Sequence, residues 1–224
     1  MHDLPPFPGF RAEALAFLRD LRANNDRAWF QRRKALYEDE LLWPARCLVA
    51  GLAEASRAAG TPLSGNPTKN VFRIYRDTRF SKDKSPYKTH VGVYVTPSGD
   101  KSDNGGLYVH VEPGASFVAT GHWDPDPRWV GEWRARLAAD PAGWRDVRDT
   151  MADAAITLSH GPAGALKRLP RGYDDPGDES VAEALRWKGV VATQPVPDDA
   201  LGPDLVDRAV GFYAVSAPLR EWVP

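Results

Sequence analysis

The chain has 224 residues, 42% of them hydrophobic, and its 29 lysines and arginines are nearly balanced by 30 aspartates and glutamates, giving a formal net charge of -1. This balance excludes a global electrostatic attraction to nucleic acid or to an anionic membrane, so any electrostatic function must be local. The length suits one domain with a sizeable core, and we expect a single domain over residues 1-224.

The N-terminal sequence and the cysteine content indicate a cytoplasmic protein. The opening stretch MHDLPPFPGFRAE has acidic residues and three prolines where a secretory signal needs its apolar core. No apolar run approaches the roughly 18 residues of a membrane span. We therefore expect a soluble, cytoplasmic protein without a membrane partner. Cys47 is the only cysteine, which excludes an internal disulfide and a multi-cysteine zinc site, and we interpret it as a small buried hydrophobe.

Three helices are expected in the first 60 residues. Apolar residues recur at helical spacing over residues 10–21, and the asparagine pair at 24–25 breaks the pattern. Asp26 is suited to cap a second helix. Pro44 is suited to open a third, which Gly60 would end. The apolar residues of the second helix are Trp29, Phe30, Leu36, Tyr37 and Leu41.

The apolar period changes from helical to alternating after residue 90. Residues 91–95 and 107–111 alternate valine or leucine with other residues, as half-buried strands do, and a third strand is expected at 116–121. The connections are polar and rich in turn residues, so we expect an antiparallel meander. If the loop at 97–105 closes symmetrically, cross-strand pairs share one polar face. The predicted pairs are Tyr94 with Tyr108, Gly92 with His110, and His90 with Glu112.

Helical patterns return after residue 125. We expect one helix with Trp129, Trp133 and Leu137 on a face, another around residues 144–151, and helix again over residues 201–222. The last third is therefore predicted to be helical and loop-rich. Segregated blocks of helix and strand favour an α+β fold, in which the central region forms an antiparallel sheet flanked by N-terminal and C-terminal helices.

Residues 69–90, which we call the basic segment, combine positive charge with aromatic rings. Seven lysines and arginines stand against two aspartates, and four aromatic side chains are interleaved. Guanidinium groups bind phosphate or carboxylate oxygens through paired hydrogen bonds, and rings can stack on a base or sugar. The segment therefore predicts binding of a phosphate-bearing or other anionic small molecule. The aromatic residues are Phe72, Tyr75, Phe80 and Tyr87.

Each kind of residue in the basic segment has an expected role. Arg73, Arg76 and Arg79 would hold the oxygens of the ligand, with at least two of them converging on one concave site. The lysines would add positive potential, and Tyr87 or Trp29 would stack on the ligand. The candidate ligand-binding residues are Arg73, Arg76, Asp77, Arg79, Lys82, Asp83, Lys84, Tyr87, Lys88 and Trp29.

Two other interpretations of the basic segment stay open. The same charges could track a nucleic-acid backbone or an acidic protein surface in a non-enzymatic binding module. The segment could also be a purely structural ion-pair network, in which Asp77 and Asp83 hold neighbouring cations. Two aspartates cannot neutralise seven bases, and this excess of positive charge favours a bound anion.

The predicted polar strand face supplies candidate catalytic residues. His110 and Glu112 are the acid–base candidates if the protein is an enzyme, a question that the sequence leaves open. His90, His110 and His122 come from nearby strands, but no HExxH or comparable spacing is present, so we expect no metal site. The phosphate-binding signatures GxxxxGK[ST] and GxGxxG and the hydrolase elbow GxSxG are also missing, so we expect no cofactor.

Four stretches of the chain resemble one protein family over nearly its whole length and in the right order. They are NNDRAWF from residue 24, FRIYRDTRFSKDKSPYK from residue 72, LYVHVEP from residue 107 and LKRLPRGY from residue 166. With them the chain is similar to the DUF2461 family, a widespread set of proteins of unknown function. Members often have a double tyrosine where this chain has Leu107-Tyr108. The resemblance implies no mechanism.

Overall fold

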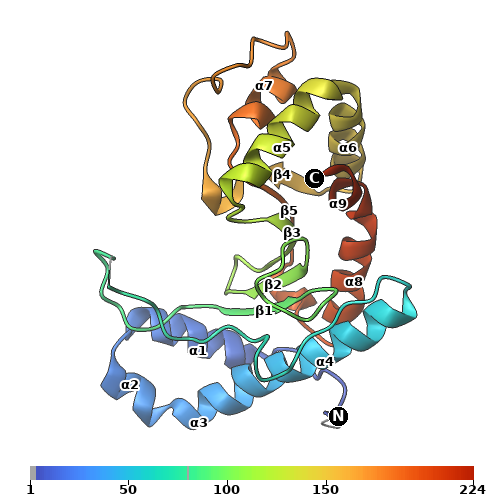
Figure 1. Cartoon of the computed structure of the whole chain (residues 1–224). Coiled ribbons are helices and arrows are strands. Elements are labelled where there is room, and N and C mark those ends of the chain that lie inside the picture. Colours follow the sequence, from blue (N-terminus) through green and yellow to red (C-terminus); the bar gives the residue numbers. More distant parts are fainter. Residues whose placement is uncertain (1–3, 80) are drawn as a thin grey trace. The chain divides into compact units, whose positions relative to one another are not determined.

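The structure, a computed structural model, describes residues 4–79 and 81–224 (Figure 1). It is an α+β fold with a five-stranded antiparallel sheet in the order β1-β2-β3-β5-β4, which confirms the expected fold class. Helices precede the first strand and follow the third. The strands are β1 (Val91–Val95), β2 (Leu107–Val111), β3 (Phe117–His122), β4 (Thr157–Ser159) and β5 (Val190–Pro195).

The described residues divide into two compact units. The first contains the chain up to Val118 together with Pro195–Gly211, and the second contains Ala119–Gln194 together with Phe212–Pro224. That the whole chain behaves as one domain stays a prediction, which limited proteolysis of the full chain would check. The helix α8 (Leu205–Val215) begins in the first unit and ends in the second.

The helices of the first unit largely follow the sequence pattern. Asp26 caps α2 as expected, because its carboxylate accepts a hydrogen bond from the backbone N–H of Trp29 at 2.8 Å. The expected second helix is divided, and Leu36 is 41% exposed instead of packing in the core. The helices are α1 (Ala12–Ala23), α2 (Arg27–Arg32), α3 (Lys34–Tyr37), the π-helical turn η1 (Glu38–Leu42) and α4 (Trp43–Ala58).

Pro44 lies at the second residue of α4 and so opens this helix as expected, while a π-helical turn joins α4 directly to α3. A proline has no N–H, so the α-helical hydrogen bond to the carbonyl of Glu40 cannot form. The backbone N–H of Trp43 binds the carbonyl of Glu38, five residues earlier, which is the π-helical pattern. The chain then continues directly into α4. Near its end Gly60 has φ +73°, which suits the stop predicted there.

Between α4 and β1 the basic segment has little regular structure. Isolated antiparallel bridges join Val71 to Val93 and Tyr75 to Tyr87. The second bridge closes a loop over residues 76–86, blue-green in Figure 1. Phe80, expected to be one of the interleaved aromatic residues, lies outside the described residues.

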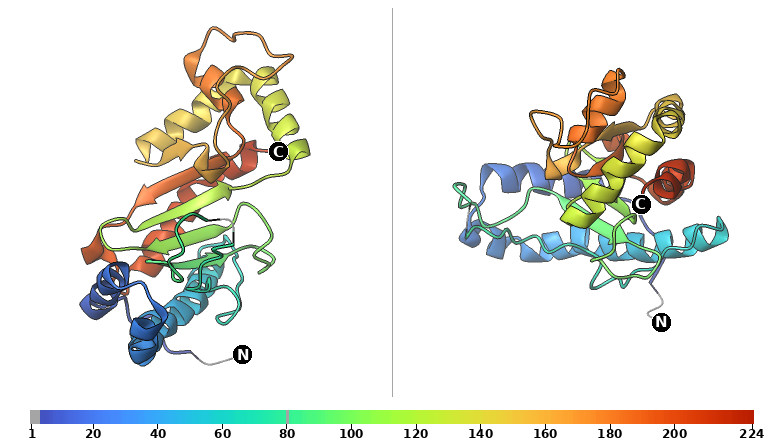
Figure 2. Two further views of the ribbon diagram at one scale, coloured as in Figure 1. Left: turned by 90° about the vertical axis from the view of Figure 1, so that its left-hand side faces the viewer. Right: turned by 45° about the horizontal axis from the view of Figure 1, so that its top comes forward.

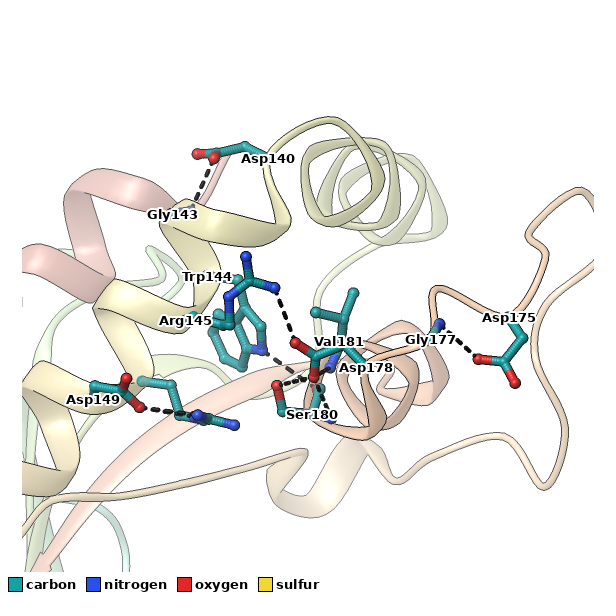
Figure 3. Close-up of polar contacts among 11 residues, drawn as sticks. Asp140, Gly143, Trp144, Arg145, Asp149, Asp175, Gly177, Asp178, Ser180 and Val181 are labelled. Carbon is teal, nitrogen blue, oxygen red and sulfur yellow. Dashed lines mark hydrogen bonds and ion pairs between the residues drawn. The ribbon is translucent and has the colours of Figure 1, made fainter.

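The second unit contains the two predicted tryptophan-bearing helices, and aspartates cap several of its helices. Asp140 accepts from the N–H of Gly143 at 2.8 Å, and Asp178, at the start of a further helix, accepts from that of Ser180 at 2.9 Å and also pairs with Arg145 (Figure 3). Such caps satisfy N–H groups that have no partner within the helix. The helices are α5 (Pro127–Ala139), α6 (Pro141–Asp153), α7 (Glu179–Arg186) and α9 (Ala217–Trp222).

The last third is helical and loop-rich as predicted, but it also contains two strands that the sequence did not predict. The strands β4 and β5 lie there and pair antiparallel, with Leu158 opposite Ala192. Val190, Val191 and Ala192 are consecutively buried, so β5 lacks the alternation that marked the first strands. A short continuous apolar run cannot be told from buried helix by its period, and β4 has only three residues.

Among the described residues, none of the helices combines the length and the apolar character that a membrane span requires.

Candidate functional site

The strands β1 and β2 lie side by side in the sheet (Figure 2). They have the predicted register, in which Gly92 pairs with His110 and Tyr94 pairs with Tyr108. The phenol of Tyr108 lies over Gly92, where a Cβ would come within 2.6 Å of its oxygen, so glycine leaves the room that this ring occupies. Val109, on the opposite face, is 1% exposed. Because side chains alternate along a strand, the predicted polar face is confirmed.

Three side chains on this face of β2 form a hydrogen-bonded row. The hydroxyl of Tyr108 lies 2.9 Å from Nδ1 of His110, and Nε2 of His110 lies 3.1 Å from a carboxylate oxygen of Glu112. The His110 ring stacks on Phe117 at 4.6 Å between ring centroids. The predicted acid–base candidates are therefore in contact, while their catalytic role stays a prediction.

Burial sets the charges of the row. It lowers the pKa of His110 against the opposing influence of Glu112. Burial alone would raise the pKa of Glu112, but the hydrogen bond and charge of His110 and the charge of Arg22 bring it below its ordinary value. Burial, with the charge of Glu112, raises the pKa of Tyr108 to about 12. At neutral pH the row thus holds a neutral imidazole, a carboxylate and an intact phenol.

The predicted convergence of arginines in the basic segment is wrong. Arg76 forms an ion pair with Asp83. Arg79 binds both oxygens of Asp77, with its Nη2 at 2.6 Å from one of them, and its side chain is 77% exposed. Arg73 lines a different cavity, beside α3 and η1. Each of the two arginines is thus paired with an aspartate only two or seven residues away in the sequence. Ion pairs with these nearby aspartates neutralise both arginines, so the excess of positive charge does not bring them together at one site.

A cavity of about 380 Å³ opens beside the basic segment, and we call it the Lys88 cavity. Four of the predicted ligand-binding residues line it together with five that were not predicted for this role. Three cations and one carboxylate are among them. The lining residues are Arg76, Asp83, Tyr87 and Lys88 from the prediction, and Arg22, Asn25, Ser85, Thr89 and His90 in addition.

The other predicted ligand-binding residues lie outside the lining of this cavity. They are Trp29, Arg73, Asp77, Arg79, Lys82 and Lys84. The ring of Trp29 is 6% exposed, packs on Phe17 at 5.5 Å and is covered by the guanidinium of Arg33 at 4.4 Å. Tyr87 borders the cavity but stacks on Phe30 at 4.1 Å. Both rings are used in packing, so the expected stacking on a ligand is not supported.

Of the three cations that line the cavity, Arg22 and Arg76 each pair with a carboxylate, whereas Lys88 does not within the described residues. It is half-buried and forms no ion pair with any residue that the structure describes. Its ammonium lies 5.6 Å from the centre of the Phe72 ring. Burial, followed by the positive charges of Arg73 and Lys101, lowers the pKa of Lys88.

Asn25 attaches the basic segment to the turn between α1 and α2. Its amide donates to the backbone carbonyl of Tyr87 at 2.9 Å, and its side-chain oxygen accepts from the N–H of Tyr87 at 3.0 Å. The Asn25 side chain thus makes the pair of backbone hydrogen bonds to Tyr87 that a neighbouring strand would make in a sheet. Our assignment of site residues from the sequence missed Asn25 and Arg22, although the stretch NND is one of those that carry the family resemblance.

Replacing Asn25 with alanine is expected to lower the free energy of unfolding by about 2 to 3 kcal/mol, because both backbone groups of Tyr87 lose a partner in a partly buried place. Urea denaturation monitored by circular dichroism measures this. Asn24→Ala is the control, since the amide of Asn24 makes one exposed hydrogen bond to Asp20. Equal losses in the two variants would contradict the attachment role of Asn25.

Three residues of the cavity lining, Arg22, Thr89 and His90, also contact the row of Tyr108, His110 and Glu112, which we call the polar row. Arg22 pairs with Glu112. The ring of His90 lies 4.3 Å from the ring of His110, and burial, then the neighbouring His110, lowers the pKa of His90 to about 4. One ligand atom each from His90, His110 and Glu112 lies within 4.8 Å of the other two, so these residues could hold a metal ion. Sequence spacing does not indicate this cluster because His90 precedes β1, whereas His110 and Glu112 lie in β2 and directly after it.

Comparison with known proteins yields a family and nothing more specific. The family model described as "Conserved hypothetical protein (DUF2461)" matches residues 13–222. No curated protein and no solved structure matches the chain.

Proposed function

Because the chain belongs to the DUF2461 family, whose description states no activity, we propose its function from its own site: it binds a small phosphate-bearing or other anionic ligand in the Lys88 cavity. The volume of about 380 Å³ suits a small molecule. The backbone on one wall is held in place by Asn25. A pre-formed site of this kind loses little conformational entropy on binding.

The main support for this proposal is the environment of Lys88, that is, its partial burial and the charges around it. A half-buried ammonium that has no carboxylate partner among the described residues and lies near two further cations is electrostatically costly in the free protein. A bound anion would remove that cost by forming charge-assisted hydrogen bonds to it. Arg22 and Arg76 also line the cavity, but each is already paired with a carboxylate, so they add orientation more than net charge.

The polar row gives this site a means of chemistry. His90 and Arg22 line the cavity, and His90 also contacts His110 while Arg22 pairs with Glu112. If the bound anion reacts, the His110 imidazole, neutral at physiological pH, is the base candidate, and Glu112 stabilises the imidazolium that forms.

The two alternatives receive different support. A purely structural network accounts for Arg79 with Asp77 and for Arg76 with Asp83. It does not account for Lys88. A nucleic-acid or acidic protein partner would bind the exposed cations along the segment, but it would not explain why the half-buried Lys88 lines a cavity. A small ligand is therefore the better explanation of the cavity.

The experiment is calorimetric titration of the full chain with inorganic phosphate and a panel of small phosphate esters, comparing Lys88→Met with Lys82→Met. Methionine keeps the apolar stem and removes the charge, and Lys82 is an exposed lysine outside the cavity lining. We expect Lys88→Met to weaken binding about tenfold or more, the effect of losing a charged hydrogen bond, and Lys82→Met to change it by less than about twofold.

Three results would contradict the proposal. Absence of binding by the wild type to every anion of the panel is the first. Equal weakening by the two variants would indicate a diffuse field instead of a site. Tight binding of oligonucleotides alone, falling steeply with added salt, would favour the polyanion alternative.

A further inference from the structure

We propose that His90, His110 and Glu112 form a binding site for a divalent first-row transition-metal ion, with zinc as its probe. The proposal rests on the arrangement of these three side chains and stands whether or not an anion binds in the Lys88 cavity. It goes against our expectation from the sequence, which was based on ligand spacing along the chain.

The separations of the ligand atoms suit a shared ion. Zinc binds imidazole nitrogen and carboxylate oxygen at about 2.0 to 2.2 Å, so two ligand atoms on one ion lie roughly 3 to 3.5 Å apart. Nε2 of His110 and the nearer oxygen of Glu112 are 3.1 Å apart. All ligand atoms of the cluster lie within 4.8 Å of one another, which side-chain rotation can close.

The surroundings of Glu112 leave one of its oxygens available. Its Oε1 is held by Arg22 and accepts from the hydroxyl of Thr89 at 3.4 Å. Its Oε2 is hydrogen-bonded to Nε2 of His110. A carboxylate oriented through Oε1 can coordinate a metal ion through Oε2 once the proton of the His110 ring is on Nδ1 instead of Nε2.

Tyr108 orients the His110 imidazole from the opposite side. When Nε2 binds a metal, Nδ1 carries the proton and must donate it to an acceptor. The Tyr108 oxygen, 2.9 Å from Nδ1, is that acceptor, since a hydroxyl can accept as well as donate. The ring stack with Phe117 holds the same orientation.

A bound metal ion would explain the position of His90 beside His110, which a hydrogen-bonded core alone does not explain. A buried polar row accounts for Tyr108, His110 and Glu112 without any ion. Within the described residues, however, no hydrogen bond reaches the ring nitrogens of His90, although the ring is half-buried and lies against His110. Two neutral imidazoles and a carboxylate form a nitrogen and oxygen donor set suited to zinc, iron, cobalt or manganese.

Three protein ligands also leave a coordination position open, as in catalytic metal sites. His90 lines the Lys88 cavity as well, so a molecule there is within reach of the ion.

The test uses the full chain, freed of metal with a chelator and dialysed against Zn²⁺, with bound zinc measured per chain. We expect one zinc per chain for the wild type and a thermal midpoint that rises with zinc. His90→Gln and Glu112→Gln should each weaken binding by about 100-fold or more, because each removes a ligand. His160→Gln, which changes an exposed histidine of the second unit, should leave binding unchanged.

A positioning role for Tyr108 is checked separately. Tyr108→Phe should weaken zinc binding about tenfold, the typical cost of removing a partner of a metal-bound histidine. The optical spectrum of the Co²⁺-bound Tyr108→Phe variant should differ from that of the Co²⁺-bound wild type. The spectrum reports the orientation of the ligands, which a purely structural role of Tyr108 would leave unchanged.

Several outcomes would overturn the site. They are absence of stoichiometric zinc in the wild type, retained binding in folded His90→Gln, or equal loss in His160→Gln, which would mark adventitious surface binding. Circular dichroism verifies folding, and if Glu112→Gln does not fold, His90→Gln and the Co²⁺ spectrum still decide. Lys88→Met should keep its zinc, so failure of the anion site and failure of the metal site are distinguishable.

Discussion

Replacing Gly121 with alanine is expected to lower the free energy of unfolding by more than about 4 kcal/mol, or to prevent folding. A Cβ at this position in β3 would lie 2.2 Å from the carbonyl oxygen of Val190 and 2.9 Å from Cα of Val191. Both are backbone atoms of β5, so no side-chain rotation relieves the overlap. The φ of Gly121, +135°, is also one that residues with a side chain rarely adopt.

The matched control is Gly164→Ala. Gly164 has φ +77°, but apart from its chain neighbours no atom of the described residues lies within 4 Å of the position that its Cβ would take. This change should cost only the backbone penalty of about 1 to 2 kcal/mol. Urea denaturation of both variants separates crowding from backbone strain, and similar losses in the two would show that the close approach of β5 is unimportant.

Replacing Trp133 with alanine is expected to cost about 3 to 5 kcal/mol, the range for deleting a large buried ring. Trp133 is 0% exposed and lies against three other tryptophans of the second unit. Its Nε1–H donates to the carbonyl of Ala184 at 3.1 Å, so the change also leaves a buried acceptor without a partner. The neighbouring tryptophans are Trp129, Trp144 and Trp222.

Trp43→Ala provides the control with the same pair of residue types. Trp43 is 44% exposed, and its removal should cost less than about 1 kcal/mol. Trp133→Phe should recover part of the loss, because it refills most of the volume while still removing the N–H donor. A loss at Trp43 as large as that at Trp133 would contradict the assignment of the core.

The sequence alone determined the features that depend on neighbouring residues. The alternation of residues 91–95 and 107–111, with a turn-rich loop between them, predicted the register that pairs Gly92 with His110. It thereby placed His110 and Glu112 side by side, since residues two apart on a strand share a face. Asp26 was recognised as a helix cap for the same reason, because its partner is three residues away.

The composition of the site was decided only by the tertiary structure. Arg22, in the last turn of α1, and Asn25, just after it, reach the Lys88 cavity although both lie more than 60 residues before Lys88 in the chain, and no local pattern encodes that approach. The count of charges in the basic segment was correct, but which cations are neutralised depends on the path of the loop. That path pairs Arg76 with Asp83 and leaves Lys88 without a carboxylate partner in the part of the chain that the structure describes.

The candidate metal ligands show the same division. His110 and Glu112 are close because of strand geometry, which the sequence predicts, whereas His90 joins them from the residue preceding β1 through the packing of its ring on His110. Ligand spacing along a chain identifies sites built on one helix or loop, and a site assembled across strands has no such spacing. The strands β4 and β5 escaped prediction for a related reason: a short, continuously buried strand has no period of its own, and only pairing with its neighbours defines it.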